Sequence, residues 1–238
     1  MQYISFAFLF LSLSSWSQSL PPKALVYGGP GACEDGCVEG AVEAAKIAGF
    51  EVTMVYPSTF DPAIFQDAAV WIHPGGKATT GAKAMGRTMM GHIRTFIGNG
   101  GGYVGFCAGA FLTTSRIGAS WTKGLGIIPG RTVLYKAKGY PTVEKMDWGG
   151  KLREIYWEGG PYFSYGVNEG RNMTVLGRYN RTNQVSAVQT SYGKGRVSVT
   201  GAHPEAPKWW RDSSNLTDND GLDYDLTTEM IVWAARKI

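Results

Sequence analysis

The sequence is poor in the residues that many functional sites require. It has three cysteines, three histidines and no block of five or more Lys or Arg among its 238 residues. Two close cysteines without a nearby His supply too few ligands for a metal ion. The missing basic block and the net charge of only +4 argue against nucleic acid or an anionic membrane as a partner. We therefore expect no metal, no cofactor and no nucleic-acid partner.

The sequence also lacks an apolar run long enough for a bilayer, which needs about 20 residues. Its apolar run from Tyr3 to Leu13 is shorter and is followed by Ser15-Trp16-Ser17, a small-x-small pattern that is typical of signal-peptide cleavage. We expect residues 1–17 to be a signal peptide and the mature chain to be secreted or periplasmic, with no stable membrane span. A buried N-terminal strand is the alternative.

Export changes the interpretation of the cysteines. Cys33 and Cys37 lie close together in "GPGACEDGC", whereas Cys107 stands alone. In an oxidising compartment the two close cysteines can form a disulfide and leave one free thiol. The alternative is that all three are small buried side chains.

The chain from residue 23 to 238 reads as one α/β domain. Apolar runs and amphipathic segments alternate, and the pattern predicts strands at 23–29, 51–57, 68–76 and 102–106 and helices at 36–50, 85–101 and 108–118. This order predicts a flavodoxin-like, mostly parallel sheet with helices on both faces. From Leu125 onward, short runs separated by turn residues predict β-rich additions, and 223–237 predicts a final helix.

Three unusual segments follow predicted strands: "IHPGG" from Ile72, "GFCAGA" from Gly105 and "TGAHPEAP" from Thr200. In an open parallel sheet, ligands bind at the carboxyl ends of the strands. We therefore expect these three segments to meet at one edge and to form the site.

The segment "GFCAG" has the spacing of a nucleophile elbow, with Cys107 as the nucleophile. Such a turn needs small neighbours, and it puts the thiol at a helix N-terminus, where the dipole favours the thiolate. The alternative is a buried structural cysteine.

A thiolate nucleophile needs a base, and the chain offers His73, His92 and His203. His92 falls mid-helix and His73 at a strand end. His203 lies two residues before Glu205, a carboxylate that could hold the imidazole in one tautomer. A turn histidine beside a surface glutamate is the alternative. The N–H groups of Gly76 and Ala108 could hold an oxyanion, unless the glycines simply form a turn.

Together these residues resemble the class I glutamine amidotransferase-like superfamily. The motifs "ALVYGGPGA" and "IYWEGGPYF" resemble the branch named for the N-terminal domain of biotin–protein ligases. The resemblance implies Cys107 as nucleophile, His203 as base, Glu205 as its orienter, and Gly76 with Ala108 as oxyanion hole. We assign substrate contacts to residues within the same motifs: Gly75, Pro30, Gly160 and Tyr162.

The sequence departs from the family at Phe111, because glutamine amidotransferases carry Gln four residues after the cysteine. Nor does it show a synthase or biotin-ligase domain, so we do not expect biotin transfer. The aromatic residues Tyr162, Tyr165, Trp209 and Trp210 are either pocket walls or ordinary core.

These observations favour a stand-alone hydrolase that cleaves a small-molecule or peptide amide, or less readily an ester, through an acyl-enzyme. The alternative is a binding module of the same fold without turnover. A structural envelope protein is a more distant alternative, since it would need none of these residues. The sequence sets no expectation for oligomeric state.

The export hypothesis predicts the N-terminus of the mature protein. Edman sequencing of the protein purified from its native host should begin near Gln18, because cleavage after Ser17 would remove the apolar run. An intact Met1 in a soluble cytoplasmic fraction would contradict this expectation.

Overall fold

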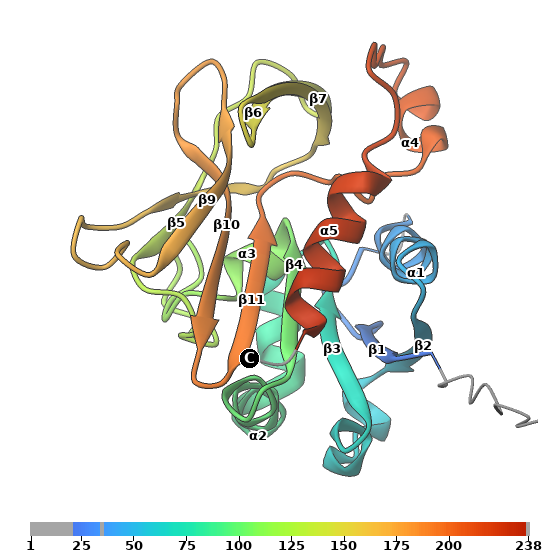
Figure 1. The fold of residues 1–238 in the computed structure, drawn as a ribbon, viewed down its shortest axis with the longest axis vertical. Coiled ribbons are helices and arrows are strands. Elements are labelled where there is room, and N and C mark those ends of the chain that lie inside the picture. Colours follow the sequence, from blue (N-terminus) through green and yellow to red (C-terminus); the bar gives the residue numbers. More distant parts are fainter. Residues whose placement is uncertain (1–20, 34–35, 237–238) are drawn as a thin grey trace, which may run out of the picture.

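The computed structural model describes residues 21–33 and 36–236, so the expected signal peptide lies outside the described residues. The described strands join into one eleven-stranded sheet, whose main path is β2-β1-β3-β4-β11-β10-β9-β6-β7. Figure 1 shows the helices α1, α2 and α5 packed around one half of this sheet, while the other half extends beyond them.

The first half of the sheet is parallel and carries the three predicted site segments. Its strands lie in the order β2-β1-β3-β4-β11, which is the 2-1-3-4-5 order of doubly wound sheets. Their bounds are β1 Lys23–Tyr27, β2 Glu51–Val55, β3 Ala68–His73, β4 Gly102–Phe106 and β11 Gly195–Thr200.

The second half of the sheet is antiparallel. The expectation of a mostly parallel sheet was therefore wrong for this half and correct only for the first half. Hairpin turns that contain Gly149 and Gly193 are too short for a parallel crossover, so each strand pairs antiparallel with its neighbour. The strands are β5 Arg131–Leu134, β6 Thr142–Trp148, β7 Lys151–Trp157, β8 Pro161–Ser164, β9 Met173–Tyr179 and β10 Val185–Tyr192.

Strand β6 was not predicted. Its side chains alternate, with Glu144, Met146 and Trp148 buried and Lys145 and Asp147 exposed. The period of two is the strand signal, but charged residues at three of its seven positions, with Glu144 on the buried face, obscured it.

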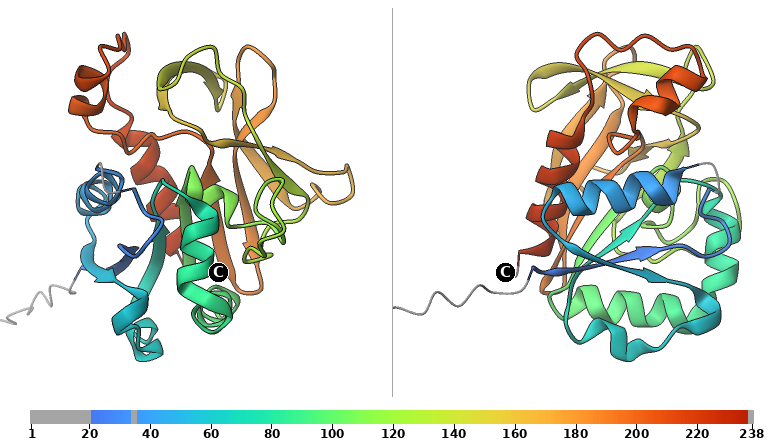
Figure 2. Two further views of the ribbon diagram at one scale, coloured as in Figure 1. Left: turned by 180° about the vertical axis from the view of Figure 1, so that it is seen from behind. Right: turned by 90° about the vertical axis from the view of Figure 1, so that its right-hand side faces the viewer.

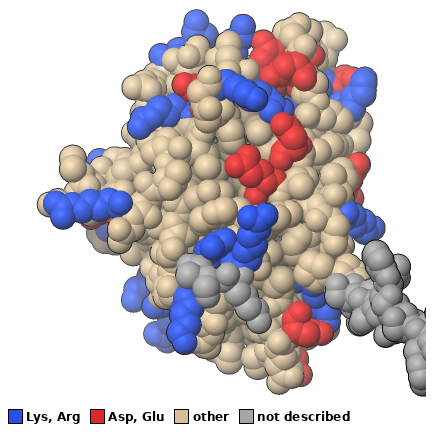
Figure 3. Space-filling model, viewed as in Figure 1, with Lys and Arg blue, Asp and Glu red and all other residues tan. Residues whose placement is uncertain are grey.

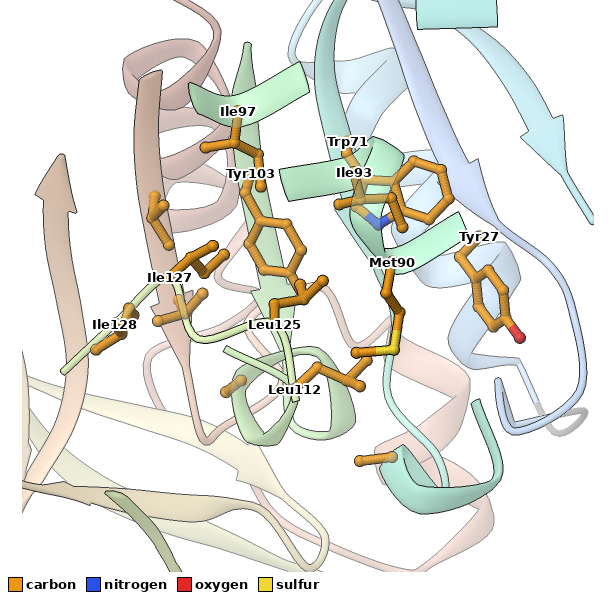
Figure 4. Packing of buried hydrophobic residues seen from close by; sticks show 14 of the residues in the cluster. Tyr27, Trp71, Met90, Ile93, Ile97, Tyr103, Leu112, Leu125, Ile127 and Ile128 are labelled. Atoms are coloured by element: carbon orange, nitrogen blue, oxygen red, sulfur yellow. The ribbon is translucent and has the colours of Figure 1, made fainter. Parts of the chain in front are cut away.

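Helices cover both faces of the parallel half, as Figure 2 shows. On one face, α2 (Ala78–Gly98) and α3 (Ala108–Phe111) pack against Leu25 and Tyr27 of β1. On the other face, α1 (Cys37–Ile47) and α5 (Tyr224–Ala235) pack against Ala24 and Val26. Because successive strand side chains point to opposite faces, one short apolar run fills two cores. Figure 4 shows the first core, with Tyr103 and Trp71 from the strands beside Ile93 and Met90 of α2.

Two helices differ from their predicted bounds. Helix α2 begins at Ala78, seven residues before its predicted start. Gly86 has a φ of 61° and interrupts the helix, which explains why the helical spacing of apolar residues in the sequence is regular only from about residue 85. Helix α3 ends at Phe111 instead of residue 118. The hydroxyl of Thr113 donates to the Ala110 carbonyl, and such side-chain bonds compete with helix continuation.

The remaining helices are short: η1 Pro57–Thr59, η2 Pro62–Phe65 and α4 Lys208–Ser213. Within residues 21–33 and 36–236, no helix combines the length and the apolar character that crossing a bilayer requires. On the face drawn in Figure 3, basic and acidic side chains both occur and are interspersed with uncharged surface.

A close backbone crossing joins the two halves of the sheet and predicts a strong effect on stability. A Cβ added at Gly160 would lie 1.6 Å from the carbonyl oxygen of Gly201, so Gly160→Ala must displace backbone. We expect the free energy of unfolding to fall by at least about 2 kcal/mol, measured by urea denaturation.

Gly91→Ala is the matched control, because the same methyl group would meet nothing within 4 Å at this position of α2. It should raise stability by about 0.5–1 kcal/mol, since alanine favours the helix. Equal effects of the two substitutions would contradict the packing argument.

Candidate active site

Cys107 lies in a tight turn between β4 and α3. Its φ of 46° and ψ of −97° put a non-glycine residue in a rarely populated region, at a cost of about 1–3 kcal/mol. The Cys107 N–H donates to the carbonyl of Thr200 at 3.0 Å, and the Tyr103 hydroxyl donates to the carbonyl of Gly109 at 2.8 Å. These bonds hold the strained turn in place from both sides.

The glycines around Cys107 allow α3 to cross the strand ends closely. A Cβ at Gly109 would lie 2.3 Å from the carbonyl oxygen of His73, and one at Gly105 would lie 2.6 Å from the Gly109 backbone. Larger residues would push α3 away from the sheet and move the thiol with it.

The strand register brings the three predicted segments to one edge. Thr200 at the end of β11 pairs with Phe106 at the end of β4, and His73 at the end of β3 pairs with Gly105. The residues that follow all three strands therefore emerge side by side.

His203 and Glu205 form a buried pair at this edge. The Nδ1 atom of His203 lies 2.8 Å from a carboxylate oxygen of Glu205, and the two residues are 2% and 0% exposed. The rings of Tyr156 and Trp210 pack edge-on against the imidazole, with centroids 6.0 and 5.3 Å away. The aromatic rings thus keep water from the imidazole.

Backbone contacts fix the turn that carries this pair. The His203 N–H donates to the Tyr156 carbonyl at 2.8 Å, and the buried Arg211 donates to the Ala206 carbonyl at 2.9 Å. Arg211 also pairs with Asp223 at 3.1 Å and with Asp218.

The electrostatics of the site favour a charged imidazole. Burial lowers the pKa of His203, but the charges of Glu205 and Cys107 and side-chain hydrogen bonding to both outweigh it, so the pKa lies well above its ordinary value. A base that is a cation at neutral pH stabilises a neighbouring thiolate. The raised pKa of His203 thus comes from its two neighbours, Glu205 and Cys107.

The Cys107 side chain is 4% exposed, and its thiol donates to the carbonyl oxygen of Glu158 at 3.5 Å. It is the free cysteine of the chain, since Cys33 and Cys37 are joined in a disulfide with Cα atoms 5.3 Å apart.

The disulfide lies against the predicted oxyanion loop. The Cys33 N–H donates to the Gly75 carbonyl at 3.1 Å. A Cβ at Gly75 would lie 2.5 Å from Cε1 of His203 and 3.1 Å from Sγ of Cys37. Gly75 therefore packs directly between the disulfide and the imidazole.

The two proposed oxyanion donors both follow the ends of strands of the parallel half. Ala108 is the first residue of α3, and the first N–H groups of a helix have no partner within it. Gly76 has a φ of 129° and bridges to Ala32. Their joint role stays a prediction.

The other predicted substrate residues are less directly connected to the thiol. The Pro30 carbonyl accepts a bond from the Tyr27 hydroxyl at 2.8 Å, and Gly160 packs against Gly201. Tyr162 lies on β8 and packs against the second core, whereas Tyr165 packs against the first. The need for glycine at position 160 is explained by packing alone.

The remaining histidines are not arranged as bases for Cys107. His73 stacks on Tyr27 with ring centroids 4.5 Å apart, and burial lowers its pKa to about 3. His92 lines a hollow of about 310 Å³ between η2 and α2, where Phe60 also contacts its ring.

One acidic cluster has oxygen atoms in a metal-binding arrangement. Glu154, Asp218 and Asp220 offer carboxylate oxygens within 4.8 Å of one another. Each already has a protein partner, since Glu154 bonds to Asn219, Asp218 to Arg211, and Asp220 to the Glu154 N–H. The expected absence of a metal stays a prediction.

Sequence reasoning missed three residues beside the thiol: Tyr140, Tyr156 and Glu158. Partial loss of hydration raises the pKa of Tyr140, and the charges of Glu158 and Cys107 raise it further, so the Tyr140 hydroxyl lies near both of these residues. Glu158 falls in the quoted "IYWEGGPYF", but nothing in that pattern showed that its carbonyl reaches the sulfur.

Comparisons with known proteins bear on the family and the fold. Residues 23–136 match the family described as "Biotin-protein ligase, N terminal". The chain is also 26% identical over 161 residues to the biotin–protein ligase of Schizosaccharomyces pombe. That match covers 58% of this chain and 25% of the ligase, so the chain spans about a quarter of the relative's length.

Solved structures show what the fold is similar to. A glutamine amidotransferase aligns with a TM-score of 0.59 and 22% identity, over 75% of this chain and 90% of that chain. A ThuA-like protein from Bacteroides uniformis aligns with a TM-score of 0.56 and 15% identity, over 89% and 98%. The chain therefore has a mixed α/β fold similar to a glutamine amidotransferase, with a partly antiparallel sheet and extra strands. The family match and the structural match fit the expected likeness to glutamine amidotransferases and to the N-terminal domain of biotin–protein ligases. Both relationships are distant.

The coupling of His203 to Glu205 predicts the pH dependence of thiol reactivity. Glu205→Gln removes the negative charge that raises the imidazole pKa, so the His203 imidazolium should lose its proton at a lower pH. We expect iodoacetamide to alkylate Cys107 about tenfold more slowly at neutral pH, because less of the imidazole beside the thiol is then charged.

Glu51→Gln is the control, because this exposed residue lies at the start of β2, at the opposite edge of the sheet. It should leave the profile of alkylation rate against pH unchanged. A folded Glu205→Gln protein with the wild-type profile would contradict the ion-pair interpretation.

Proposed function

We propose that this chain is an exported hydrolase that cleaves amide bonds through an acyl-enzyme on Cys107. We further propose that it belongs to the class I glutamine amidotransferase-like superfamily, in the branch related to the N-terminal domain of biotin–protein ligases, with a flavodoxin-like parallel half. The observation that carries the proposal is the strained, buried Cys107 beside a His203–Glu205 pair whose imidazole pKa is raised.

In the acylation step, the Cys107 thiolate attacks the amide carbonyl carbon. The developing oxyanion would be held by the N–H groups of Ala108 and Gly76. His203 then gives its proton to the leaving nitrogen, the C–N bond breaks, and an amine departs from a thioester. Glu205 stabilises the imidazolium before this transfer and keeps Nδ1 as the bonded nitrogen.

In the deacylation step, the neutral imidazole takes a proton from water, and the resulting hydroxide attacks the thioester carbon. The thiolate leaves, the carboxylic acid is released, and His203 is again a cation. Every proton in this cycle moves through one imidazole, so one buried base suffices for both steps.

The substrate is not expected to be held as glutamine is. Phe111 occupies the position four residues after the nucleophile and is half-buried against the first core. It offers no amide to a polar substrate. A small-molecule or peptide amide bound by other residues of the site fits better.

A screen of amide libraries tests the proposal. Released amine should be detected by a fluorogenic amine reagent, and Cys107→Ala should lower the rate at least about 1000-fold because the nucleophile is removed. Mass spectrometry of the quenched wild-type reaction should show an acyl adduct on the peptide that contains Cys107.

His203→Asn should accumulate less adduct, since it cannot protonate the leaving amine. Gly91→Ala, on the surface of α2, should retain wild-type activity. If no amide acylates Cys107 while the protein remains folded, the chain is better described as a binding module of the same fold.

A further inference from the structure

We propose that the exposed rim of this site, formed by the Glu158 carboxylate and the Tyr140 ring and called here its mouth, selects amides that carry a positive charge near the scissile bond. The inference rests on the proposed function and specifies its substrate class. The carboxylate and the ring are adjacent to the nucleophile and are not used in the chemical steps above.

Hydrogen bonds hold both the backbone and the side chain of Glu158. Its carbonyl oxygen accepts the Cys107 thiol at 3.5 Å, and its Oε2 atom accepts the Tyr156 hydroxyl at 3.1 Å. Tyr156 in turn packs on the His203 ring. The carboxylate is therefore positioned by the same residues that bury the catalytic base.

The charge of Glu158 is not neutralised by a protein cation. Within residues 21–33 and 36–236, the ion pairs of Lys and Arg are made with other carboxylates. Glu158 is partly exposed, so a ligand at the mouth can reach it. An unpaired carboxylate beside a binding site attracts a ligand cation and repels a ligand anion.

Tyr140 supplies the second element. Its ring is 71% exposed and is held edge-on against Trp157, with ring centroids 6.0 Å apart. A Cβ at Gly159 would lie 3.2 Å from the Tyr140 hydroxyl, so the ring lies over the residue after Glu158. An exposed aromatic face next to a carboxylate is the arrangement that binds ammonium or guanidinium groups through both charge and the ring quadrupole.

The same conclusion follows from what a substrate with another charge would meet. A carboxylate or phosphate near the scissile amide would face the Glu158 carboxylate, whereas the charged His203 ring is buried under Tyr156 and Trp210. A neutral substrate would leave the Glu158 charge without a partner. A cationic group is the one that gains from the charges present at this mouth.

Charged thiol reagents test the proposal without requiring turnover. The cationic 2-(trimethylammonium)ethyl methanethiosulfonate, the anionic 2-sulfonatoethyl methanethiosulfonate and neutral methyl methanethiosulfonate each convert the Cys107 thiolate to a mixed disulfide and release methanesulfinate. Each rate is divided by the rate of the same reagent with 2-mercaptoethanol. We expect the corrected rate of the cationic reagent to exceed that of the anionic one by about tenfold or more.

Glu158→Gln keeps the side-chain length and the backbone carbonyl but removes the charge, so it should bring the cation-to-anion ratio down by at least about fivefold. Glu51→Gln makes the same change in net charge at the opposite edge of the sheet and should leave the ratio as in the wild type. Tyr140→Ala, at an exposed position, should lower the cationic rate by about threefold without moving the anionic rate.

The outcomes separate this inference from the proposed function. Equal corrected rates for the three reagents in the wild type, or a ratio unchanged by Glu158→Gln, would overturn cation selection and leave the hydrolase proposal standing. A thiol that none of the reagents labels in folded protein would count against both.

Discussion

The pairing of β4 with β11 is the constraint on which the candidate site depends. These strands run parallel, and Thr200 lies opposite Phe106, so the nucleophile turn and the histidine turn start from neighbouring points. The bond from the Cys107 N–H to the Thr200 carbonyl extends that pairing by one residue into the turn itself. Because the register of a buried parallel pair cannot slip without exposing its apolar side chains, the relative position of the two turns is fixed by the core.

Burial gives the site its electrostatic character. A carboxylate that is 0% exposed requires a partner, and in this chain the partner is an imidazole enclosed by Tyr156, Trp210 and Gly75. Without water, the attraction between the Glu205 carboxylate and the His203 imidazolium is stronger. Loss of either partner would leave the other as a buried charge without compensation. The disulfide adds to this enclosure, because Cys37 Sγ contacts the same glycine that packs on the imidazole.

The antiparallel half of the sheet completes the site that the parallel half begins. Strand β7 supplies Tyr156 and ends just before Glu158, whose carbonyl reaches the sulfur. Figures 1 and 2 show β6, β7 and α4 at the end of the molecule toward which β4 and β11 point. The extra strands thus lie over the strand ends that carry the candidate site.

The sequence by itself determined the parallel strands, the helices that cover them, the turn at Cys107 and the candidate pair His203 and Glu205. These features are local, because apolar periodicity, glycine spacing and a two-residue separation are all properties of a short segment. The tertiary structure decided how the predicted β-rich additions pair into an antiparallel half, where α2 starts, and that Tyr140, Tyr156 and Glu158 lie at the site. Their positions depend on strand pairing between residues far apart in the chain, and no local pattern specifies which carbonyl will face which sulfur.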